Sequence, residues 1–155
     1  MLYLDASALV KRYSAEKGSR AVVARFESGE KIFTSMLSFG EVHTSIARKF
    51  RSKKLSSVAL AKLHAELEND WVHNLSVVGL DLRTMSALPQ LVEQYDLRAG
   101  DAVHLSAAFW LKHSIRVRNG RDLPAEPVEF GVSDRRLAKV ALECGLQVFN
   151  PEDED

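Results

Sequence analysis

The chain has few of the residues that mark secreted, fibrous or membrane-spanning proteins. Its 155 residues include one cysteine, four prolines and eight glycines. Cys144 cannot form an internal disulfide, and its place in the periodic apolar stretch 139–149 predicts a buried thiol in a reducing compartment rather than a nucleophile. No uncharged stretch approaches the roughly 20 residues of a membrane span, and Asp5 comes too early for a signal peptide. We therefore expect a cytoplasmic protein with no membrane partner.

Low-complexity segments are also absent, so residues 1–150 are expected to form one compact domain, followed by an acidic tail at 151–155. The formal net charge is zero, with 21 basic and 21 acidic residues. Four acidic residues lie in the tail, so residues 1–150 hold 21 basic and 17 acidic groups. Their net charge of +4 is compatible with a polyanionic partner.

Basic residues gather in two places. Each cluster is a candidate for contacts with a nucleic-acid backbone, and a solvated helix end is the alternative for each. The first cluster comprises Arg48, Lys49, Arg51, Lys53 and Lys54, and the second comprises Arg116, Arg118 and Arg121.

Short apolar runs alternate with helically spaced stretches along the chain. The runs predict strands at 2–4, 31–34, 75–78, 128–132 and 146–149, and the stretches predict helices at 6–13, 14–26, 35–50, 82–95, 101–113 and 135–144. Another helix is expected to start within 55–60, with Ser56 as its N-cap. The segment 114–127 is expected to be a loop, with a strand extension or a mobile flap as the alternatives. Such alternation indicates an α/β fold with a parallel sheet covered on both faces.

Four carboxylates stand in these apolar surroundings. Asp5 and Asp134 directly follow predicted strands, whereas Glu41 and Asp101 lie early in predicted helices. Because ligands of open parallel sheets bind beyond the carboxyl ends of the strands, we expect the four to lie together. Oxygen donors favour hard divalent cations, so the set predicts a site for Mg²⁺ or Mn²⁺. Without a cation, repulsion should raise the pKa of at least one member.

Each carboxylate also has a structural explanation. Asp5 can cap the first helix, Ser38 to Glu41 fits a capping box, and Asp101 and Asp134 can favour helix N-termini through the macrodipole. Four unrelated caps would not predict such similar surroundings as Asp-Ala-Ser-Ala, Asp-Ala-Val-His and Ser-Asp-Arg-Arg. As a set, the four residues favour the metal site.

The histidines offer a competing scheme. His104 shares a helix face with Asp101, but its apolar neighbours predict a packed or hydrogen-bonded imidazole. The remaining histidines, His43, His64, His73 and His113, show neither paired spacing nor a cysteine companion, so a zinc site is not expected. No serine stands in a nucleophile-elbow context, which argues against a Ser-His-Asp hydrolase.

Four segments together carry a family resemblance: Leu-Asp-Ala-Ser-Ala-Leu-Val-Lys-Arg-Tyr, Ser-Phe-Gly-Glu-Val, Leu-Arg-Ala-Gly-Asp-Ala-Val-His-Leu-Ser-Ala-Ala and Ser-Asp-Arg-Arg-Leu. In their order and approximate spacing, over nearly the whole chain, the sequence resembles the PIN-domain family and, within it, the VapC-type ribonuclease toxins of toxin–antitoxin pairs. The resemblance implies a three-layer α/β/α sandwich with a central, mostly parallel five-stranded sheet. It also implies endoribonuclease activity, with Asp5, Glu41, Asp101 and Asp134 as catalytic, metal-binding residues for Mg²⁺ or Mn²⁺.

The same resemblance implies an RNA substrate, a cognate VapB-type antitoxin and a homodimer, to which the apolar helices within 35–71 are candidate contributors. Ser7 matches a hydroxyl that often accompanies the first Asp of the family. Many relatives carry Thr or Ser two residues before the last Asp, where this chain has Val132; Ser133 is the candidate replacement. Val132 therefore leaves a second hypothesis, a PIN-like module that binds RNA or protein without cutting. A phosphatase-like hydrolase with Asp5 as nucleophile is a third.

Overall fold

Five strands form one parallel sheet in the order β3-β2-β1-β6-β7. The computed structural model describes residues 1–114, 117–118, 121–122 and 127–154. The sheet strands are β1 (Leu2–Leu4), β2 (Ile32–Ser35), β3 (Leu75–Val78), β6 (Glu129–Gly131) and β7 (Gln147–Phe149). All five predicted strands are present, and the predicted parallel sheet is confirmed.

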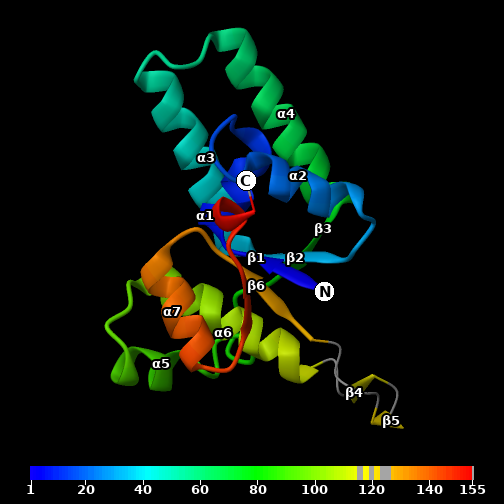
Figure 1. Cartoon of the computed structure of the whole chain (residues 1–155), viewed down its shortest axis with the longest axis vertical. Coiled ribbons are helices and arrows are strands. Elements are labelled where there is room, and N and C mark those ends of the chain that lie inside the picture. Colours follow the sequence, from blue (N-terminus) through cyan, green and yellow to red (C-terminus); the bar gives the residue numbers. More distant parts are fainter. Residues whose placement is uncertain (115–116, 119–120, 123–126, 155) are drawn as a thin grey trace.

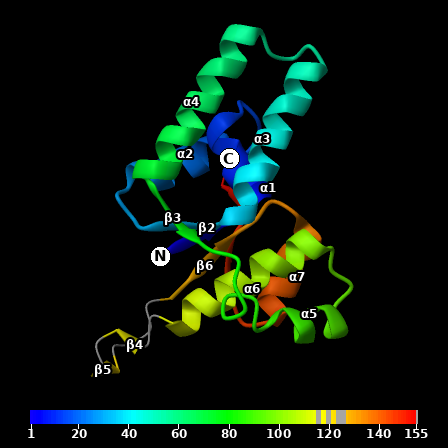
Figure 2. The ribbon, with the colours of Figure 1, turned by 180° about the vertical axis from the view of Figure 1, so that it is seen from behind.

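Helices cover both faces of the sheet (Figures 1 and 2). One layer contains α1 (Ala6–Leu9), the 3-10 helix η1 (Val10–Tyr13), α2 (Ser19–Glu27), α3 (Met36–Arg51) and α4 (Ser57–His73). The other contains α5 (Leu88–Gln94), α6 (Ala99–Ser114) and α7 (Arg135–Glu143). The predicted three-layer sandwich is therefore confirmed. No helix in the described ranges is both long and apolar enough to cross a membrane.

Alternating side chains of β1 point into two separate cores. Leu2 and Leu4 pack in the cluster that includes Val42 and Ile46 of α3, on the α1–α4 side. Tyr3 points to the other face and stacks on Phe130, in the cluster beneath α5, α6 and α7. All three β1 side chains are fully buried. This two-sided burial explains why the strand is a continuous apolar run rather than an alternating one.

The strand order reverses between β1 and β6. From β1 the chain proceeds outward through β2 to β3, and it later returns to the opposite side of β1 to form β6 and β7. Leu4 pairs with Gly131, and the Asp5 N–H donates to the Gly131 carbonyl oxygen at 2.9 Å, so β1 and β6 end side by side. In open α/β sheets such a reversal leaves a crevice at the carboxyl ends of the strands, where ligands bind.

Two helices begin later than predicted. The helix predicted at 14–26 begins at Ser19, because Gly18 adopts a left-handed conformation (φ 85°) that a continuing helix cannot accommodate. The helix predicted at 82–95 begins at Leu88, with Pro89 in its first turn. Before it, Asp81 and Thr84 close turns by accepting hydrogen bonds from neighbouring amides.

The region predicted as a loop at 114–127 contains two short antiparallel strands, β4 (Val117–Arg118) and β5 (Arg121–Asp122). The rest of the stretch from 115 to 126 lies outside the described residues, as does Asp155.

The C-terminal acidic segment packs against the first helical layer. Pro151–Asp153 form the 3-10 helix η2, which Figure 1 shows beside α1 and α2. The buried Lys11 ammonium donates to Glu152 at 2.8 Å and to the Lys17 carbonyl oxygen at 2.8 Å. The contact with Glu152 attaches η2 to η1, and the contact with Lys17 holds the turn before α2 against η1.

Candidate active site

Asp5 lies at the end of β1 and is the most buried of the four predicted site carboxylates. It is 4% exposed, and it is the N-cap of α1, accepting the Ala8 N–H at 2.8 Å. The Ser7 hydroxyl lies 2.8 and 2.9 Å from its two oxygens. Burial raises the pKa of Asp5 to about 6, against the opposing effects of His104 and these hydrogen bonds. The expected raised pKa is therefore present, but burial is its main cause and the charge of Glu41 contributes least.

The loop after β6 reaches the same point. The Ser133 N–H donates to the Ser7 oxygen at 2.9 Å, which joins the segment before Asp134 to the segment after Asp5. Asp134 is the N-cap of α7 and accepts the amides of Arg136 and Leu137 at 2.8 and 3.1 Å. The Ser133 hydroxyl is buried, and within the described part of the chain it has no hydrogen-bond partner. Both candidate serines thus lie between the two strand ends.

Glu41 reaches the site from α3 through a histidine. His104 Nε2 lies 2.9 Å from a Glu41 carboxylate oxygen, and His104 Nδ1 lies 3.1 Å from the Tyr3 hydroxyl. Burial, with the charge of Asp5, raises the pKa of Tyr3, so the phenol stays protonated and can donate to Nδ1. This contact assigns the neutral tautomer with the proton on Nε2, and that N–H donates a hydrogen bond to Glu41. The predicted hydrogen-bonded histidine is confirmed.

A glycine at the start of α6 makes room for Glu41. A Cβ on Gly100 would lie 3.0 Å from a Glu41 carboxylate oxygen, so a larger residue would push against this side chain. The predicted capping box is wrong: the N-cap of α3 is Ser35, which accepts the Leu37 amide, and Glu41 lies further along the helix. Glu41 therefore has no capping role, and its contacts are with α6.

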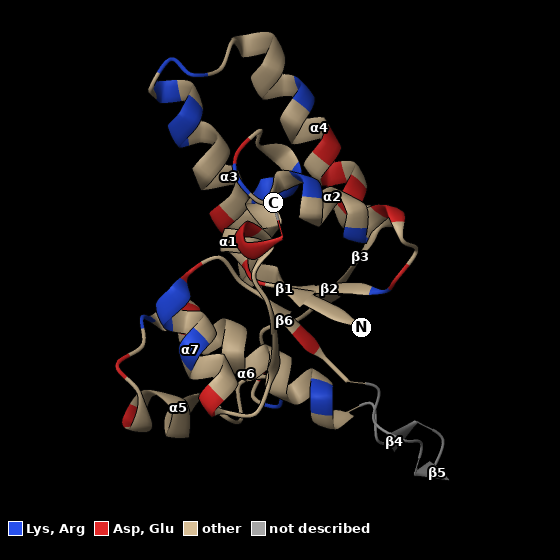
Figure 3. Ribbon diagram, in the orientation of Figure 1, with Lys and Arg blue, Asp and Glu red and all other residues tan. Residues whose placement is uncertain are grey.

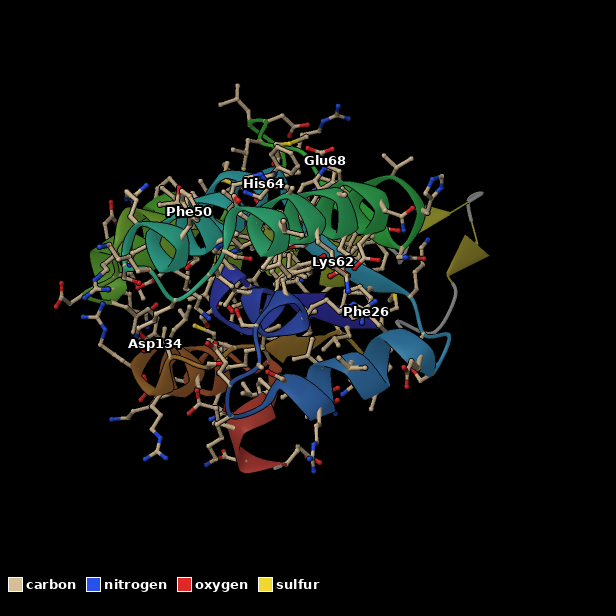
Figure 4. All side chains as sticks on the ribbon, turned by 90° about the horizontal axis from the view of Figure 1, so that it is seen from above. Phe26, Phe50, Lys62, His64, Glu68 and Asp134 are labelled. Atoms are coloured by element: carbon tan, nitrogen blue, oxygen red, sulfur yellow. The ribbon has the colours of Figure 1, made fainter. Side chains whose placement is uncertain are left out.

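Asp101 lies in the first turn of α6 and contacts a cation from α7. The Arg136 guanidinium lies 3.5 Å from Asp101 and 3.5 Å from Asp96. The Asp101 side chain is 22% exposed, so it borders solvent where Asp5 does not. Figure 4 shows Asp134 beside α7, which also carries Arg136.

Each of the four carboxylates has a protein partner. Among the residues that the structure describes, no three His, Cys, Asp or Glu side chains form a group that could hold a metal ion as they stand. Glu41 and Asp101 would have to exchange His104 and Arg136 for a cation. The chemistry of the site suits one: its carboxylates and the unpartnered Ser133 hydroxyl are oxygen donors, which hard cations prefer.

The first predicted basic cluster lies apart from these carboxylates. Figure 3 shows the first cluster at the far end of the α3–α4 hairpin. Arg51 is ten residues beyond Glu41, or about 15 Å along a helix axis. Lys49 is engaged by Glu16 and Ser14, at 2.6 Å each. In the second cluster, Arg118 and Arg121 belong to β4 and β5, and Arg116 lies outside the described residues.

Two contributors escaped the sequence-based prediction. Tyr3 was part of an apolar run, and Arg136 was simply part of a helix start. Arg136 had a usable signal, since it follows Asp134 by two residues at the expected ligand edge. Tyr3 had none, because a buried strand tyrosine gives no sign of the histidine that its hydroxyl will meet.

Comparisons with known proteins place this geometry in a family. Two proteins of Mycobacterium tuberculosis, named Ribonuclease VapC45 and Ribonuclease VapC49, are each 31% identical to the chain over 109 residues, which cover 70% of this chain and 75% of theirs.

Solved structures share the fold at low identity. FitAcB from Neisseria gonorrhoeae superposes with a TM-score of 0.67 at 18% identity, over 97% of this chain and 98% of that one. VapC20 of Mycobacterium tuberculosis, described as a sarcin-ricin loop cleaving toxin, superposes with a TM-score of 0.56 at 14% identity, over 90% and 95% of the two chains. The family model described as the PIN domain matches residues 2–142. The chain therefore belongs to the PIN domain family.

Proposed function

We propose that this protein is a divalent-metal-dependent endoribonuclease and the toxin of a VapBC-type toxin–antitoxin pair. The observation that carries the proposal is the buried carboxylate of Asp5 at the reversal of strand order, which is joined through the Ser7 hydroxyl to the segment that carries Asp134. The charge of Glu41 also contributes to the raised pKa of Asp5. The ribonuclease names of the curated relatives indicate the reaction.

The cofactor is proposed to be Mg²⁺ or Mn²⁺, held by Asp5, Glu41, Asp101 and Asp134, since these ions prefer carboxylate oxygens. When bound, such an ion provides a Lewis acid for the phosphate and lowers the pKa of an attacking water.

The protein's own groups hold this constellation in place. The Ser7 hydroxyl and the Ala8 amide orient the Asp5 carboxylate, and His104 orients Glu41 from the opposite helical layer. Arg136 is about half exposed beside Asp101, and its planar guanidinium suits two oxygens of a phosphodiester. In this role Arg136 would leave Asp101 for the RNA backbone when the site is loaded.

An antitoxin and a second copy of the chain are the proposed protein partners. The solved structures that share the fold include FitAB bound to a DNA fragment (TM-score 0.65, 16% identity). For the homodimer, α4 carries Val58 and Val72, which are 78% and 72% exposed, a feature that fits an apolar contact with another chain.

RNA cleavage with and without metal tests the proposal. We expect the purified protein to cut a structured RNA in Mg²⁺ or Mn²⁺, and EDTA to abolish cleavage. Asp101→Asn should be inactive, while the control Asp153→Asn, an exposed aspartate on η2, should match the wild type.

Equal activity in Asp101→Asn or in EDTA would refute a metal-dependent nuclease. Tight RNA binding without cleavage or metal uptake would instead favour the module that binds and does not cut. Its one hint was Val132, whose side chain is fully buried in the core beneath α7 and so does not enter the site.

A further inference from the structure

Two histidines far apart in the sequence meet between α3 and α4. The His43 and His64 ring centroids are 4.8 Å apart, with the ring planes inclined by 73°. Phe39 packs edge-on against both His43 and Trp71, with ring centroids 4.5 and 4.9 Å apart, and so lies beside the histidine pair. Neither histidine belongs to the acidic site described above.

Both imidazoles have an unused nitrogen. The Nε2 atoms of His43 and His64 are buried and have no hydrogen-bond partner among the residues that the structure describes. Buried polar atoms are nearly always paired, so two neighbouring exceptions call for a common explanation such as a water or an ion. The adjacent Phe39 and Trp71 rings provide no acceptor, and unprotonated Nε2 is a common metal ligand.

The separation of the rings matches what a shared ion would impose. Two imidazoles bound to one tetrahedral ion, each with a metal–nitrogen distance of about 2.1 Å, have ring centroids about 5 Å apart. Glu68 follows His64 by one helical turn, and Figure 4 shows both along one side of α4, with Lys62 on the other. The Glu68 carboxylate also acts electrostatically on His43.

We propose that His43 and His64 form a binding site for a borderline-soft divalent cation such as Zn²⁺, with water completing the coordination. As placed, no described carboxylate or thiol joins them in a three-ligand group, so Glu68 contributes only if its exposed side chain turns inward. Imidazole nitrogens select Zn²⁺ over Mg²⁺, whereas the carboxylates near Asp5 favour the hard cation.

The two sites are distinct although α3 contributes to both. Glu41 and His43 are two residues apart, so their side chains leave the helix about 200° apart. Glu41 faces α6, through its contact with His104, and His43 faces α4. An ion at the histidine pair would cross-link α3 to α4 without occupying the acidic site.

Calorimetric titration with Zn²⁺ tests the pair. The parent for all samples is the whole chain with Asp101→Asn, which weakens metal uptake at the acidic site. This parent is compared with variants that also carry His43→Gln, His64→Gln or both. The matched control, His73→Gln with His113→Gln, removes two imidazoles elsewhere. Circular dichroism melting of each metal-free variant confirms that it is folded.

We expect saturable binding of one Zn²⁺ at the pair, unchanged in the control. Loss of an outer-shell partner of a metal site lowers affinity about 10- to 100-fold, so loss of either ligand should lower it at least tenfold. Saturating Zn²⁺ should raise the melting temperature of the control but not that of His43→Gln/His64→Gln. Zn²⁺ binding that persists in that double variant, or no saturable binding in the parent, overturns the proposal.

Discussion

Asp5 and Asp70 are equally buried carboxylates in very different surroundings. Asp70, in α4, is 3% exposed and contacts a cation: Arg12 Nε lies 3.2 Å away, and Tyr13 and Asn74 donate to it at 3.1 and 2.6 Å. Asp5 is 4% exposed, and its hydrogen-bond donors are the neutral Ser7 hydroxyl and Ala8 amide. In the part of the chain that the structure describes, no Lys or Arg makes an ion pair with Asp5.

This difference separates a carboxylate that stabilises the fold from one that is available for chemistry. Asp70 is paired across η1 and α4, and burial and its charge together raise the pKa of Tyr13, which keeps that phenol protonated as a donor. Asp5 bears the cost of burial without an ion pair, as its raised pKa indicates. Perturbed carboxylates of this kind concentrate at functional sites.

The largest expected contrast is in activity. If the carboxylate of Asp5 serves catalysis, Asp5→Asn should lower the RNA-cleavage rate by about 10³-fold, which corresponds to about 4 kcal/mol of barrier. Asp70→Asn should stay near the wild-type rate at a temperature where it is folded. Initial rates in Mn²⁺ measure both, and comparable losses in the two variants would break the distinction.

The next contrast is in the free energy of unfolding, and here Asp70→Asn rather than Asp5→Asn is expected to cause the loss. Asp70→Asn should lower the free energy of unfolding by about 2 to 3 kcal/mol, because the buried ion pair with Arg12 is lost. This loss is small for a broken buried ion pair, because Arg12 is 31% exposed and its guanidinium can turn toward water. Urea denaturation measures it, with Asp153→Asn as the exposed control; equal stability of the two variants would contradict a structural role for Asp70.

Asp5→Asn should instead stabilise the metal-free protein, in a pH-dependent way. The pKa of Asp5 is raised from 3.8 to about 6 in the folded state, so the wild type loses stability as pH rises from about 4 to 6. The variant has no such group, and its advantage should grow over that range to on the order of 3 kcal/mol at pH 7. Urea midpoints at pH 4 and pH 7 measure this; an advantage that is larger at pH 4 would show that the sign is wrong.

The smallest effect isolates one hydrogen bond of Asp70. Tyr13→Phe removes the hydroxyl that donates to Asp70 and leaves the ring in place. We expect a loss of about 1 kcal/mol in the free energy of unfolding, with the cleavage rate unchanged. Tyr95→Phe is the matched control for removing a phenolic hydroxyl, since Tyr95 is half-buried between α5 and α6 and its hydroxyl meets Cys144 rather than a carboxylate. A lowered cleavage rate in Tyr13→Phe would connect the Asp70 network to the active site.

Most of the fold could be predicted from local sequence patterns. β1 and β3 have their predicted bounds, and Ser56 caps α4 as expected, because these features depend on a few adjacent residues. The starts of α2 and α5 were misplaced although Gly18 and Pro89 marked them. A helical pattern that extends past such a residue predicts a longer helix than the backbone can form.

Less of the candidate active site could be predicted from the sequence. The sequence placed Asp5 and Asp134 at strand ends, since strand position follows from apolar runs. It did not predict that Glu41 would contact His104, because these residues are 63 apart and belong to helices that cover opposite faces of the sheet. The capping explanation of Glu41 failed for a local reason: it required Ser38 as the N-cap, whereas α3 begins at Met36 with Ser35 as its N-cap, close to the predicted helix start.

Local sequence patterns were enough to predict which segments become strands and helices, the parallel sheet, and the strand ends that Asp5 and Asp134 follow. Side-chain periodicity is a local property, and it specifies which face of each element is apolar. Three-dimensional packing selects the carboxylate that pairs with Arg12, the one that pairs with Arg136 and the one that has only neutral donors. It also brought His43 to His64, whose spacing in the sequence had argued against a zinc site. These pairings depend on the packing of distant elements and on side-chain rotamers, which no local pattern encodes.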